Sequence, residues 1–555
     1  MNVRIFGPPG TGKTYTLVKV LGHMIGIDHA GEFIEEYGVE LPFNAFDRKD
    51  IVFMSHTNTA VDELIGRLGL RRTYKSGLWG TMHGIALHLL LEKNKSAKKY
   101  SNNTLSKPGA VNWWKSKFAR EYGIAYDPDE EAAVLPGNRF FQAYSKAVHV
   151  YFPEYNDMKR VLDKLSQEDD EFGRWAEGWI KFKKEHKIID FDDMLVLAYM
   201  ADVVPDHKVL IADEFQDFSP LQWALFKNWM VDMEYTIVAG DDDQCLYSYT
   251  GASPKFMLHE FPADESIVLK RSFRLPSQIL ALSKMFVSNL VTNRYPKEFS
   301  PRTEGGKVTM KSILPYKIPS LAQWLAKNNY NVLVLARTNS QVRMLEELFL
   351  HRHVPYYRLK TRKAQVWKDF VDRIVSFVEA LRAGERVPVA EARFYLKFTG
   401  LPKDKIEPLA KAIADNPRNL AALKITQKPA AHLKLSKLVG FFGSQKRAHL
   451  AMGALKMSLT GATKLPAKIY LDTIHAAKGR EADAVILYDS LTNRVMDEMY
   501  AEGRESFETE ARVWYVGMTR ARSILVINRG EYPFVTPQVN RIVRTMKAKV
   551  AERRE

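Results

Sequence analysis

The chain has 555 residues, more than a single hydrophobic core usually supports, so we expect three or four domains or subdomains. Its 81 lysines and arginines outnumber its 65 aspartates and glutamates, and the resulting formal charge of +16 suits a polyanionic partner such as a nucleic acid. The single cysteine, Cys245, excludes an internal disulfide and a cysteine-based zinc site.

The sequence carries no signal for membrane insertion. Residues 1–20 lack the long apolar run of a secretory signal. No stretch reaches the roughly 18 consecutive apolar residues of a membrane-spanning helix. We therefore expect a soluble, intracellular protein with no membrane partner.

Short apolar runs recur along the chain, and each ends in polar or glycine-rich residues. Runs that are short, β-branched and continuously apolar are typical of buried parallel strands. The amphipathic stretch at 340–352 is typical of a helix that connects two such strands. We predict strands at residues 3–7, 50–56, 208–214, 235–241, 266–270, 331–337, 484–490 and 523–529.

Two stretches interrupt this alternation. Residues 85–185 and 357–462 are helical in pattern and rich in lysine, and neither contains an apolar run of the strand type. We interpret both as insertions between strands of a core. The last segment, 541–555, is a basic tail, for which the sequence leaves a helix and a disordered segment open.

The first apolar run leads into G-P-P-G-T-G-K-T at residues 7–14, and a helical pattern follows. In this context the backbone N–H groups and the helix N-terminus cradle phosphates, the lysine reaches the outer phosphates, and the threonine hydroxyl binds Mg²⁺. The predicted nucleotide contacts are Gly7, Pro8, Pro9, Gly10, Thr11, Gly12, Lys13, Thr14 and Tyr15.

A second signal is VLIADEFQD at residues 209–217, an apolar strand that ends in two carboxylates. Asp213 is the predicted Mg²⁺ ligand beside Thr14, and Glu214 is the predicted group that orients or deprotonates water. Acidic pairs after strands are common, but one that follows a phosphate-binding loop indicates a nucleotide hydrolase. The two signals together predict that the chain binds a nucleotide with Mg²⁺, and the family resemblance below identifies the expected cofactors as ATP and Mg²⁺.

From here the chain resembles a known family. DEFQD at 213–217 and VAGDDDQCLYSYTGA at 238–252 resemble motifs II and III of the UvrD/Rep family of superfamily 1 DNA helicases. Later segments of the chain resemble further motifs of that family in the same order. The similarity therefore covers nearly the whole chain apart from the two insertions. The further matching segments are SHTNTAVDEL (55–64), GTMHG (80–84), DFDDML (190–195), LKRSFR (269–274), LARTN (335–339), TIHAAKGREAD (473–483) and ARVWYVGMTRA (511–521).

The resemblance implies roles around the nucleotide. Gln244 would couple the γ-phosphate to DNA, and Arg274 and Arg520 would approach that phosphate from the second core as arginine fingers. Phe273, at the family's tyrosine position, would stack on the base, and Glu481 would hold the ribose. The predicted catalytic group is thus Lys13, Glu214, Gln244, Arg274 and Arg520.

The resemblance also implies a binding face for single-stranded DNA. Rings can stack on bases without sequence preference, while amides and basic groups hold phosphates. The predicted DNA contacts are His56, Thr57, Asn58, Thr81, His83, Tyr247, Tyr249, Arg337, Thr338 and His475.

The chain departs from the family pattern at several positions. Thr250 stands where the family usually has an arginine, and His56 replaces a common phenylalanine. Motif V usually reads K-G-L-E-F, whereas Arg480 and Ala482 occur here. These changes leave the details of base stacking and interdomain coupling open.

The implied fold is α/β, with two RecA-like parallel-sheet motor domains and two mainly helical inserted subdomains. Closing the two motor domains on ATP and reopening them after hydrolysis would drive stepping along DNA. The predicted divisions are 1–84 and 186–270 for the first core, 85–185 for its insertion, 271–356 and 463–540 for the second core, 357–462 for its insertion, and 541–555 for the tail.

The implied function is an ATP-dependent DNA helicase or translocase that acts in replication, repair or recombination, in the cytoplasm of a bacterial or phage-infected cell. Its partners would be single-stranded and tailed duplex DNA, with replication or repair proteins. Three alternatives stay open: a translocase that displaces proteins without unwinding, an RNA helicase, and a non-catalytic DNA-binding recruitment subunit. Motifs III, V and VI favour 3′→5′ movement, although GPPGTGKT and TNTAVDEL also resemble the 5′→3′ branch.

One expectation concerns the base of the nucleotide. Family members usually carry a glutamine upstream of the phosphate loop that reads adenine, whereas residues 1–6 leave room only for a strand. The family's arginine after G-K-T is Tyr15 here. Because stacking discriminates bases weakly, we expect a relaxed nucleotide selectivity, unless Tyr15 or an insertion residue replaces the adenine contact.

Overall fold

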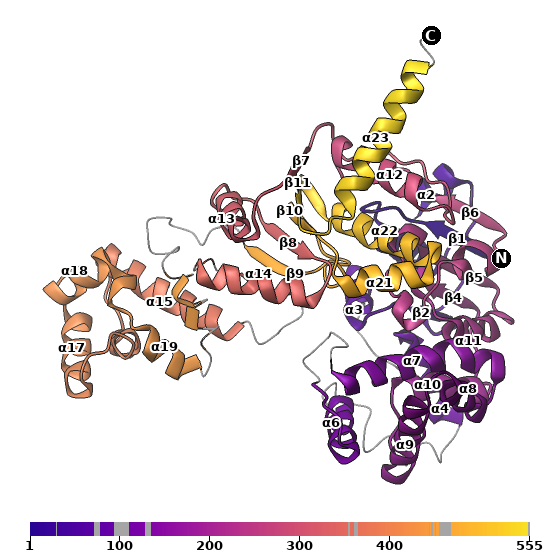
Figure 1. The fold of residues 1–555 in the computed structure, drawn as a ribbon, viewed down its shortest axis with the longest axis horizontal. Coiled ribbons are helices and arrows are strands. Elements are labelled where there is room, and N and C mark those ends of the chain that lie inside the picture. The colour runs from indigo at the N-terminus through magenta and orange to yellow at the C-terminus, as the bar shows by residue number, and fades with distance from the viewer. Residues whose placement is uncertain are drawn as a thin grey trace. The chain divides into compact units, whose positions relative to one another are not determined.

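The computed structural model describes residues 1–28, 30–70, 78–93, 110–127, 135–352, 354, 356–359, 365–442, 445, 448–449, 451–453, 455 and 468–552. The chain forms two compact units (Figure 1). The first comprises Met1–Gly305 and Met499–Thr519, and the second comprises Gly306–Glu498 and Arg520–Glu555. In the described ranges, no helix is both long enough and apolar enough to cross a membrane.

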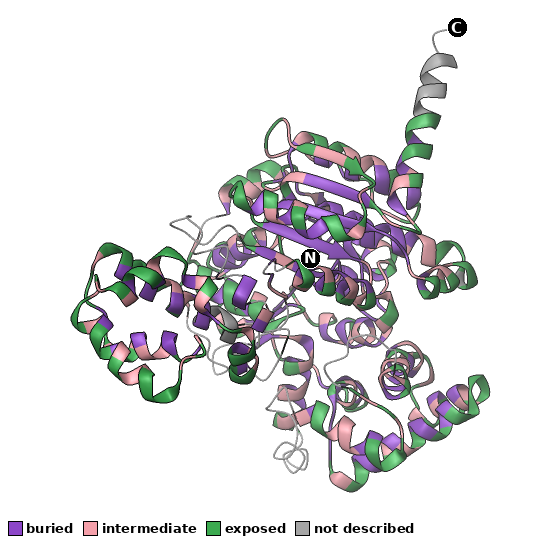
Figure 2. Cartoon of the chain, turned by 60° about the vertical axis from the view of Figure 1, so that its left-hand side comes forward, coloured by how far each residue is buried: buried purple, intermediate pink, exposed green. Residues whose placement is uncertain are grey.

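The first unit is built on a six-stranded sheet in the order β3-β2-β4-β5-β1-β6. Every neighbouring pair is parallel, as the continuous apolar runs predict. Strands β2 to β5 are buried almost throughout, and strands drawn in Figure 2 are largely in the colour of buried residues. The strands are β1 (Asn2–Phe6), β2 (Ile51–Met54), β3 (Leu78–Gly80), β4 (Val209–Ala212), β5 (Tyr235–Gly240) and β6 (Glu265–Val268).

Helices of the first unit include the helix predicted after the phosphate loop and those of the first insertion. The described part of 85–185 is helical, as predicted, and large aromatic side chains such as Trp175 and Trp179 fill its core. The helices are α1 (Lys13–Met24), α2 (Gly31–Tyr37), α3 (Asn58–Arg67), α4 (Met82–Lys93), α6 (Ala110–Tyr122), α7 (Pro136–Tyr155), α8 (Met158–Glu168), α9 (Asp170–His186), α10 (Phe191–Met200), α11 (Pro220–Met230), α12 (Ser277–Leu290) and α22 (Arg504–Met518). Short 3₁₀ turns η4 (Phe215–Asp217) and η5 (Asp242–Gln244) follow β4 and β5.

The second unit is built on a five-stranded sheet in the order β7-β11-β10-β8-β9, again with every neighbouring pair parallel. The central strands are buried and correspond to predicted runs, whereas the edge strands β7 and β9 were not predicted. The strands are β7 (Lys307–Lys311), β8 (Val332–Ala336), β9 (Ile469–Thr473), β10 (Ala482–Asp489) and β11 (Ala521–Arg529).

Helices of the second unit include the second insertion, which is helical in its described part, as predicted. The basic tail is part of a helix that continues to Glu552. The helices are α13 (Ile318–Lys327), α14 (Asn339–His351), α15 (Gln365–Ala383), α16 (Val389–Leu396), α17 (Lys403–Asp415), α18 (Leu420–Gln427), α19 (Leu435–Phe442), α21 (Asn493–Glu502), which begins in this unit, and α23 (Val535–Glu552).

The compact units divide the chain differently from the predicted cores. Residues 271–305 and Met499–Thr519 belong to the first unit, whereas the predicted second core includes them. The reason is local packing. Helices α12 and α22 pack against each other, and α22 also contacts η5 of the first unit. Strand β6 pairs with β1 at the edge of the first sheet. The residues that follow β6 therefore start from the first unit and remain part of it.

Candidate nucleotide and nucleic-acid site

The phosphate-binding sequence forms the loop between β1 and α1, as predicted. The Gly7 N–H donates to the Gly240 carbonyl at 2.8 Å, which ties the start of the loop to the end of β5. A Cβ atom at Gly7 would lie 1.8 Å from Cγ of Lys13, so only glycine leaves room for the lysine stem. Gly12 is in the left-handed region, with φ of 81°, and the helix begins directly after it.

Two short polar contacts join this loop to the end of β4. Nζ of Lys13 lies 3.1 Å from Oε1 of Glu214. The Thr14 hydroxyl donates to Oδ2 of Asp213 at 3.2 Å. The structure therefore places the predicted cation, Mg²⁺ ligands and general base together at the carboxyl edge of the first sheet, where α/β proteins gather their ligands.

The pair Thr14 and Asp213 fits a magnesium ion. Both side chains offer oxygen atoms, which Mg²⁺ prefers, and one or two protein oxygens suffice when phosphates and waters supply the rest. Burial and the nearby charge of Glu214 raise the pKa of Asp213 to about 6. A divalent cation would favour the ionised carboxylate and so relieve both causes of that shift.

Glu214 is held in an unusual backbone conformation. Its φ is 56°, the left-handed region, which costs a residue other than glycine roughly 1–3 kcal/mol. The Glu214 N–H donates to Oδ1 of Asp213 at 2.9 Å, and Oε2 of Glu214 accepts from Nε2 of Gln216 at 2.7 Å. The side chain of the predicted general base is thus oriented by hydrogen bonds within the turn after β4.

Gln216 connects Glu214 to the turn that carries Gln244. Its Oε1 accepts from the Asp241 N–H at 2.9 Å, and Oδ2 of Asp241 accepts from Nε2 of Gln244 at 2.7 Å. A continuous chain of hydrogen bonds therefore runs from the predicted general base to the predicted phosphate sensor. Gln216 is not among the predicted site residues, although its place inside the DEFQD motif was an available signal.

The segment after β6 lies against the phosphate loop. The Phe273 N–H donates to the Gly10 carbonyl at 2.7 Å, and the Ser272 hydroxyl donates to the Pro9 carbonyl at 2.8 Å. Arg274 was predicted to approach from the second core, but it belongs to the first unit, where its guanidinium donates to the Thr519 carbonyl at 3.3 Å. Pairing of β6 with β1 explains this placement.

Two exposed aromatic rings flank the loop. Phe273 is 61% exposed and Tyr15 is 52% exposed. An ideal Cβ on Gly12 would lie 3.7 Å from Cβ of Tyr15 and 4.0 Å from a ring carbon of Phe273. Both predicted base-stacking side chains are therefore available to a ligand at this loop.

The remaining predicted nucleotide residues belong to the second unit. Glu481 precedes β10 and forms an ion pair with Arg522. Arg520 immediately precedes β11, is 2% exposed, and its carbonyl accepts from the Ala482 N–H. Their assignment to the nucleotide stays a prediction.

The predicted DNA contacts after β8 and β9 lie at the carboxyl edge of the second sheet. Arg337 and His475 are half-buried there. The Thr338 hydroxyl accepts from the Gln341 N–H and begins α14, so this side chain has a capping role besides the predicted one.

In the first unit, three predicted DNA contacts form an aromatic group. The rings of His56 and Tyr247 stack at 5.1 Å with an interplanar angle of 12°, and Tyr249 meets Tyr247 edge-on at 6.0 Å. His56 and Tyr249 are exposed, so the group presents ring surface to solvent. Such a surface can stack on bases of any sequence.

The other predicted DNA contacts of this unit differ in their availability. Thr57 and Thr81 accept hydrogen bonds from backbone N–H groups at the starts of α3 and α4, while Asn58 is exposed. His83 packs edge-on against Phe191 at 5.8 Å, and burial lowers the pKa of His83 to about 4. At neutral pH His83 is therefore uncharged and offers a ring rather than a cation.

A basic cavity of about 380 Å³ lies where the end of β11 meets α23. Arg529, Arg541 and Arg544 line it together with Thr536 and Asn540. Among the described residues, none forms an ion pair with these three guanidinium groups. Arginine forks match phosphate oxygens, so this surface suits a polyanion, as the net charge of the chain predicts.

Comparison with known proteins agrees with these features. The family model described as "UvrD/REP helicase N-terminal domain" matches residues 1–262, and the one described as "UvrD-like helicase C-terminal domain" matches residues 443–531. The first match covers the phosphate loop, the β4 turn and the η5 turn. The second covers the segments TIHAAKGREAD (473–483) and ARVWYVGMTRA (511–521).

Individual bacterial proteins are similar over long stretches. The ATP-dependent DNA helicase UvrD2 of Mycobacterium tuberculosis is 26% identical in an alignment that covers 61% of this chain and 51% of that protein. The ATP-dependent DNA helicase Rep of Buchnera aphidicola is 23% identical in an alignment that covers 63% of this chain and 52% of that protein. DNA helicase II of Escherichia coli is 20% identical in an alignment that covers 96% of this chain and 82% of that protein.

The matched region spans about half the length of the first two of these relatives. The two parallel sheets confirm the predicted fold class, and the phosphate loop, the acidic turn after β4 and both family matches agree in order and position. The chain belongs to the UvrD/Rep family of helicases, whose members are ATP-hydrolysing enzymes.

Proposed function

We propose that this protein is a DNA-stimulated ATPase that moves along single-stranded DNA and unwinds tailed duplexes. The observation that carries the proposal is the group at the edge of the first sheet. There Lys13 lies 3.1 Å from Glu214, and Thr14 lies 3.2 Å from Asp213. Cation, base and oxygen ligands for Mg²⁺ thus occupy one site beside a phosphate-binding loop.

The residues act on ATP in distinct ways. The loop N–H groups and Lys13 bind the phosphates. Thr14 and Asp213 would hold Mg²⁺, which would supply neutralisation of the phosphate charge. Glu214, oriented by Gln216, accepts a proton from the attacking water. Arg274 and Arg520 stabilise the charge that develops during transfer.

Three features support DNA as the polymer. Family membership supports it most strongly, since the named relatives are DNA helicases. The stacked group of His56, Tyr247 and Tyr249 offers rings for bases. Tyr247 follows Gln244 by three residues, so a strand on these rings would act on the turn that holds the phosphate sensor.

We further propose that the two parallel-sheet regions are the motor domains and that the helical insertions are accessory subdomains. The first insertion comprises α4 and α6–α9, and the second comprises α15–α19. Alternating grip on the strand, driven by ATP binding and hydrolysis, would produce stepping.

ATPase assays with and without single-stranded DNA test the core of the proposal. Stimulation by DNA is expected, and stimulation by RNA alone would assign the motor to RNA. Absence of turnover with any nucleic acid would favour the alternative, a non-catalytic recruitment subunit. The intact set of Lys13, Asp213 and Glu214 argues against that alternative.

Unwinding is expected on duplexes with a 3′ tail and not on duplexes with a 5′ tail. The reason is the resemblance of motifs III, V and VI to the 3′→5′ branch of the superfamily. Strand separation of labelled duplexes that differ only in the tail measures the polarity. Unwinding of the 5′-tailed duplex alone would reverse the assignment.

Tailed DNA that carries a bound protein as a roadblock, compared with bare tailed duplex, distinguishes unwinding from protein displacement. A motor that clears the roadblock but leaves bare duplex intact would be a translocase. One that opens bare duplex at a comparable rate would be a helicase.

The kcat/KM values for DNA-stimulated hydrolysis of ATP, GTP, CTP and UTP are expected to lie within about tenfold of one another, because stacking on Tyr15 and Phe273 recognises any base. Phe273→Ala is expected to raise KM for all four nucleotides by similar factors. Tyr500→Ala, at a residue that is 80% exposed in the same unit, is the control. A preference for ATP of about a hundredfold or more would show that hydrogen bonds read adenine.

A further inference from the structure

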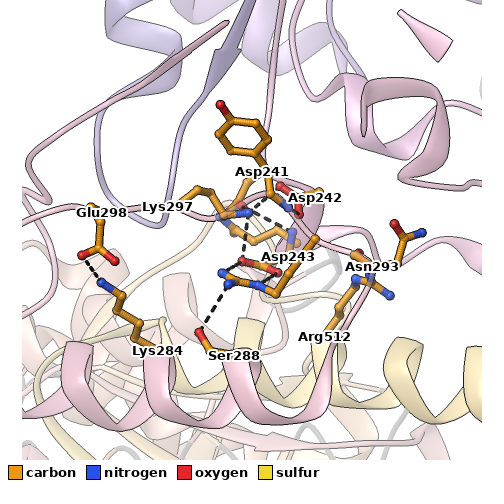
Figure 3. A network of polar contacts seen from close by, with 12 residues as sticks. Asp241, Asp242, Asp243, Lys284, Ser288, Asn293, Lys297, Glu298 and Arg512 are labelled. Atoms are coloured by element: carbon orange, nitrogen blue, oxygen red, sulfur yellow. Dashed lines mark hydrogen bonds and ion pairs between the residues drawn. The ribbon is translucent and has the colours of Figure 1, made fainter. Parts of the chain in front are cut away.

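A buried network of charges lies behind the Gln244 turn in the first unit (Figure 3). Asp241, Asp242 and Asp243 follow β5 in succession, and the side chains of all three are fully buried. The ammonium group of Lys297, which is 2% exposed, lies 2.9 Å from Asp241 and 2.9 Å from Asp243 and also contacts Asp242. One cation thus binds three consecutive carboxylates.

The residues before Lys297 add further contacts to the same turn. Arg294 donates from two nitrogens to the two oxygens of Asp243, at 2.9 and 2.6 Å. The Tyr295 N–H donates to Oδ2 of Asp242 at 2.9 Å. The Tyr295 ring stacks on Phe6 at 4.1 Å, directly before the phosphate loop. The segment 294–297 is therefore fitted between the end of β1 and the η5 turn.

Helix α22 fixes the other side of this segment. Glu508 accepts from the Thr292 N–H at 3.1 Å and also from the Thr292 hydroxyl. Nη2 of Arg512 donates to the Asn293 carbonyl at 2.7 Å. Residues 292–297 are thus held by α22 on one side and bind the acidic turn on the other, which leaves Lys297 little freedom to move.

The charge balance makes this lysine essential to the local shape. Burial and repulsion from its two acidic neighbours raise the pKa of Asp242 to about 6. Although burial opposes ionisation, Lys297 and Arg294 bring the pKa of Asp243 down to about 2. Without Lys297, three buried carboxylates would face the single charge of Arg294, and their repulsion would open the turn.

Asp241 is the link between this network and the ATP site. The same carboxylate that Lys297 binds through Oδ1 accepts the Gln244 amide through Oδ2. Its N–H donates to Gln216, whose amide binds Glu214. A change in the position of Asp241 therefore moves both the predicted phosphate sensor and the group that orients the predicted base.

We propose that Lys297 is a positioning residue for ATP hydrolysis: by binding Asp241, Asp242 and Asp243 together, it holds the turn that aims Gln244 and, through Gln216, orients Glu214. This inference rests on the proposed function, because Gln244 is the predicted phosphate sensor of the ATPase. Lys297 itself is not among the predicted nucleotide or DNA contacts.

The variant Lys297→Met keeps the length of the side chain and removes its charge. DNA-stimulated kcat is expected to fall about tenfold, the middle of the range for coupled neighbouring residues. The ratio of DNA-stimulated to basal turnover is expected to fall with it, while the Kd of a fluorescent ATP analogue stays within about twofold, because the phosphate loop is intact. A smaller folded fraction would lower both rates equally and leave the ratio unchanged, so the ratio distinguishes positioning from stability.

Three further variants complete the test. Lys284→Met removes a lysine of α12 that pairs with the exposed Glu298, and it is the matched control, with no expected effect on the ratio. Gln244→Ala and the double variant Gln244→Ala/Lys297→Met are expected to have the same stimulation ratio, because Lys297 acts on that ratio through the position of Gln244. Adding Asp242→Asn to Lys297→Met removes one buried negative charge and is expected to recover Tm but not the ratio.

The outcomes separate this inference from the proposed function. If the parent protein shows no DNA-stimulated turnover, the proposed function fails. If the parent is stimulated and Lys297→Met keeps the parental ratio, the positioning role fails. If Asp242→Asn restores the ratio together with Tm, Lys297 serves charge balance alone, and the positioning role is again overturned.

Discussion

Lys13→Ala is expected to abolish measurable ATP turnover while the protein remains folded. The ammonium group is the cation of the phosphate loop, and removal of one such electrostatic contact typically costs about 10²–10³ in rate. Its side chain is only 12% exposed and contacts Glu214 at 3.1 Å, so the fold of the variant is checked separately. Steady-state hydrolysis at saturating DNA measures the effect, and circular dichroism checks the fold.

Lys19→Ala is the matched control for this variant. Lys19 lies on the same helix and pairs with Asp28, away from the carboxylates of β4. Its replacement should leave turnover at the parental level. Parental turnover in Lys13→Ala would mean that the loop is not the ATP site.

Glu214→Gln is expected to bind ATP, Mg²⁺ and DNA but to hydrolyse ATP about 10²–10⁴ times more slowly, because an amide cannot accept the proton from water. The glutamine has the same shape and its oxygen can still accept from Gln216. Removing the charge of Glu214 also removes a cause of the raised pKa of Asp213, so Mg²⁺ binding should persist. Single-turnover hydrolysis, with nucleotide and DNA affinities measured separately, gives the result.

Glu265→Gln, at an exposed position of β6, provides the control for a general loss of negative charge. A near-normal hydrolysis rate in Glu214→Gln would assign the base to another group. A parallel loss of nucleotide affinity would instead indicate that Glu214 mainly positions Lys13.

Much of the fold could be predicted because the central strands are buried on both faces. Such strands need continuous apolar residues, and the runs at β4, β5, β8 and β10 carry that pattern. The strands that were missed, β3, β7 and β9, all lie at sheet edges. An edge strand has one paired side and tolerates polar residues, as Lys307–Lys311 and the buried Asp472, which binds Arg358, illustrate.

The nucleotide site could be predicted for a related reason. The phosphate loop and the acidic turn carry their chemistry in contiguous residues, and each follows its own strand. Parallel strands place their carboxyl ends at one edge, so Lys13 and Asp213 are expected at the same edge of the sheet, and the strand order leaves only β5 between β1 and β4. The contacts of Thr14 and Glu214 agree with that expectation.

The sequence by itself therefore determined the fold class and the family and predicted a site for phosphates, because each is encoded in short contiguous patterns. Only the tertiary structure decided that residues 271–305 and α22 belong with the first sheet, and that Arg274 lies on that side. Only the structure, too, joined Lys297 to carboxylates about 55 residues earlier in the chain. A buried lysine has no local signature, since what keeps it charged is the set of distant carboxylates that the fold brings around it.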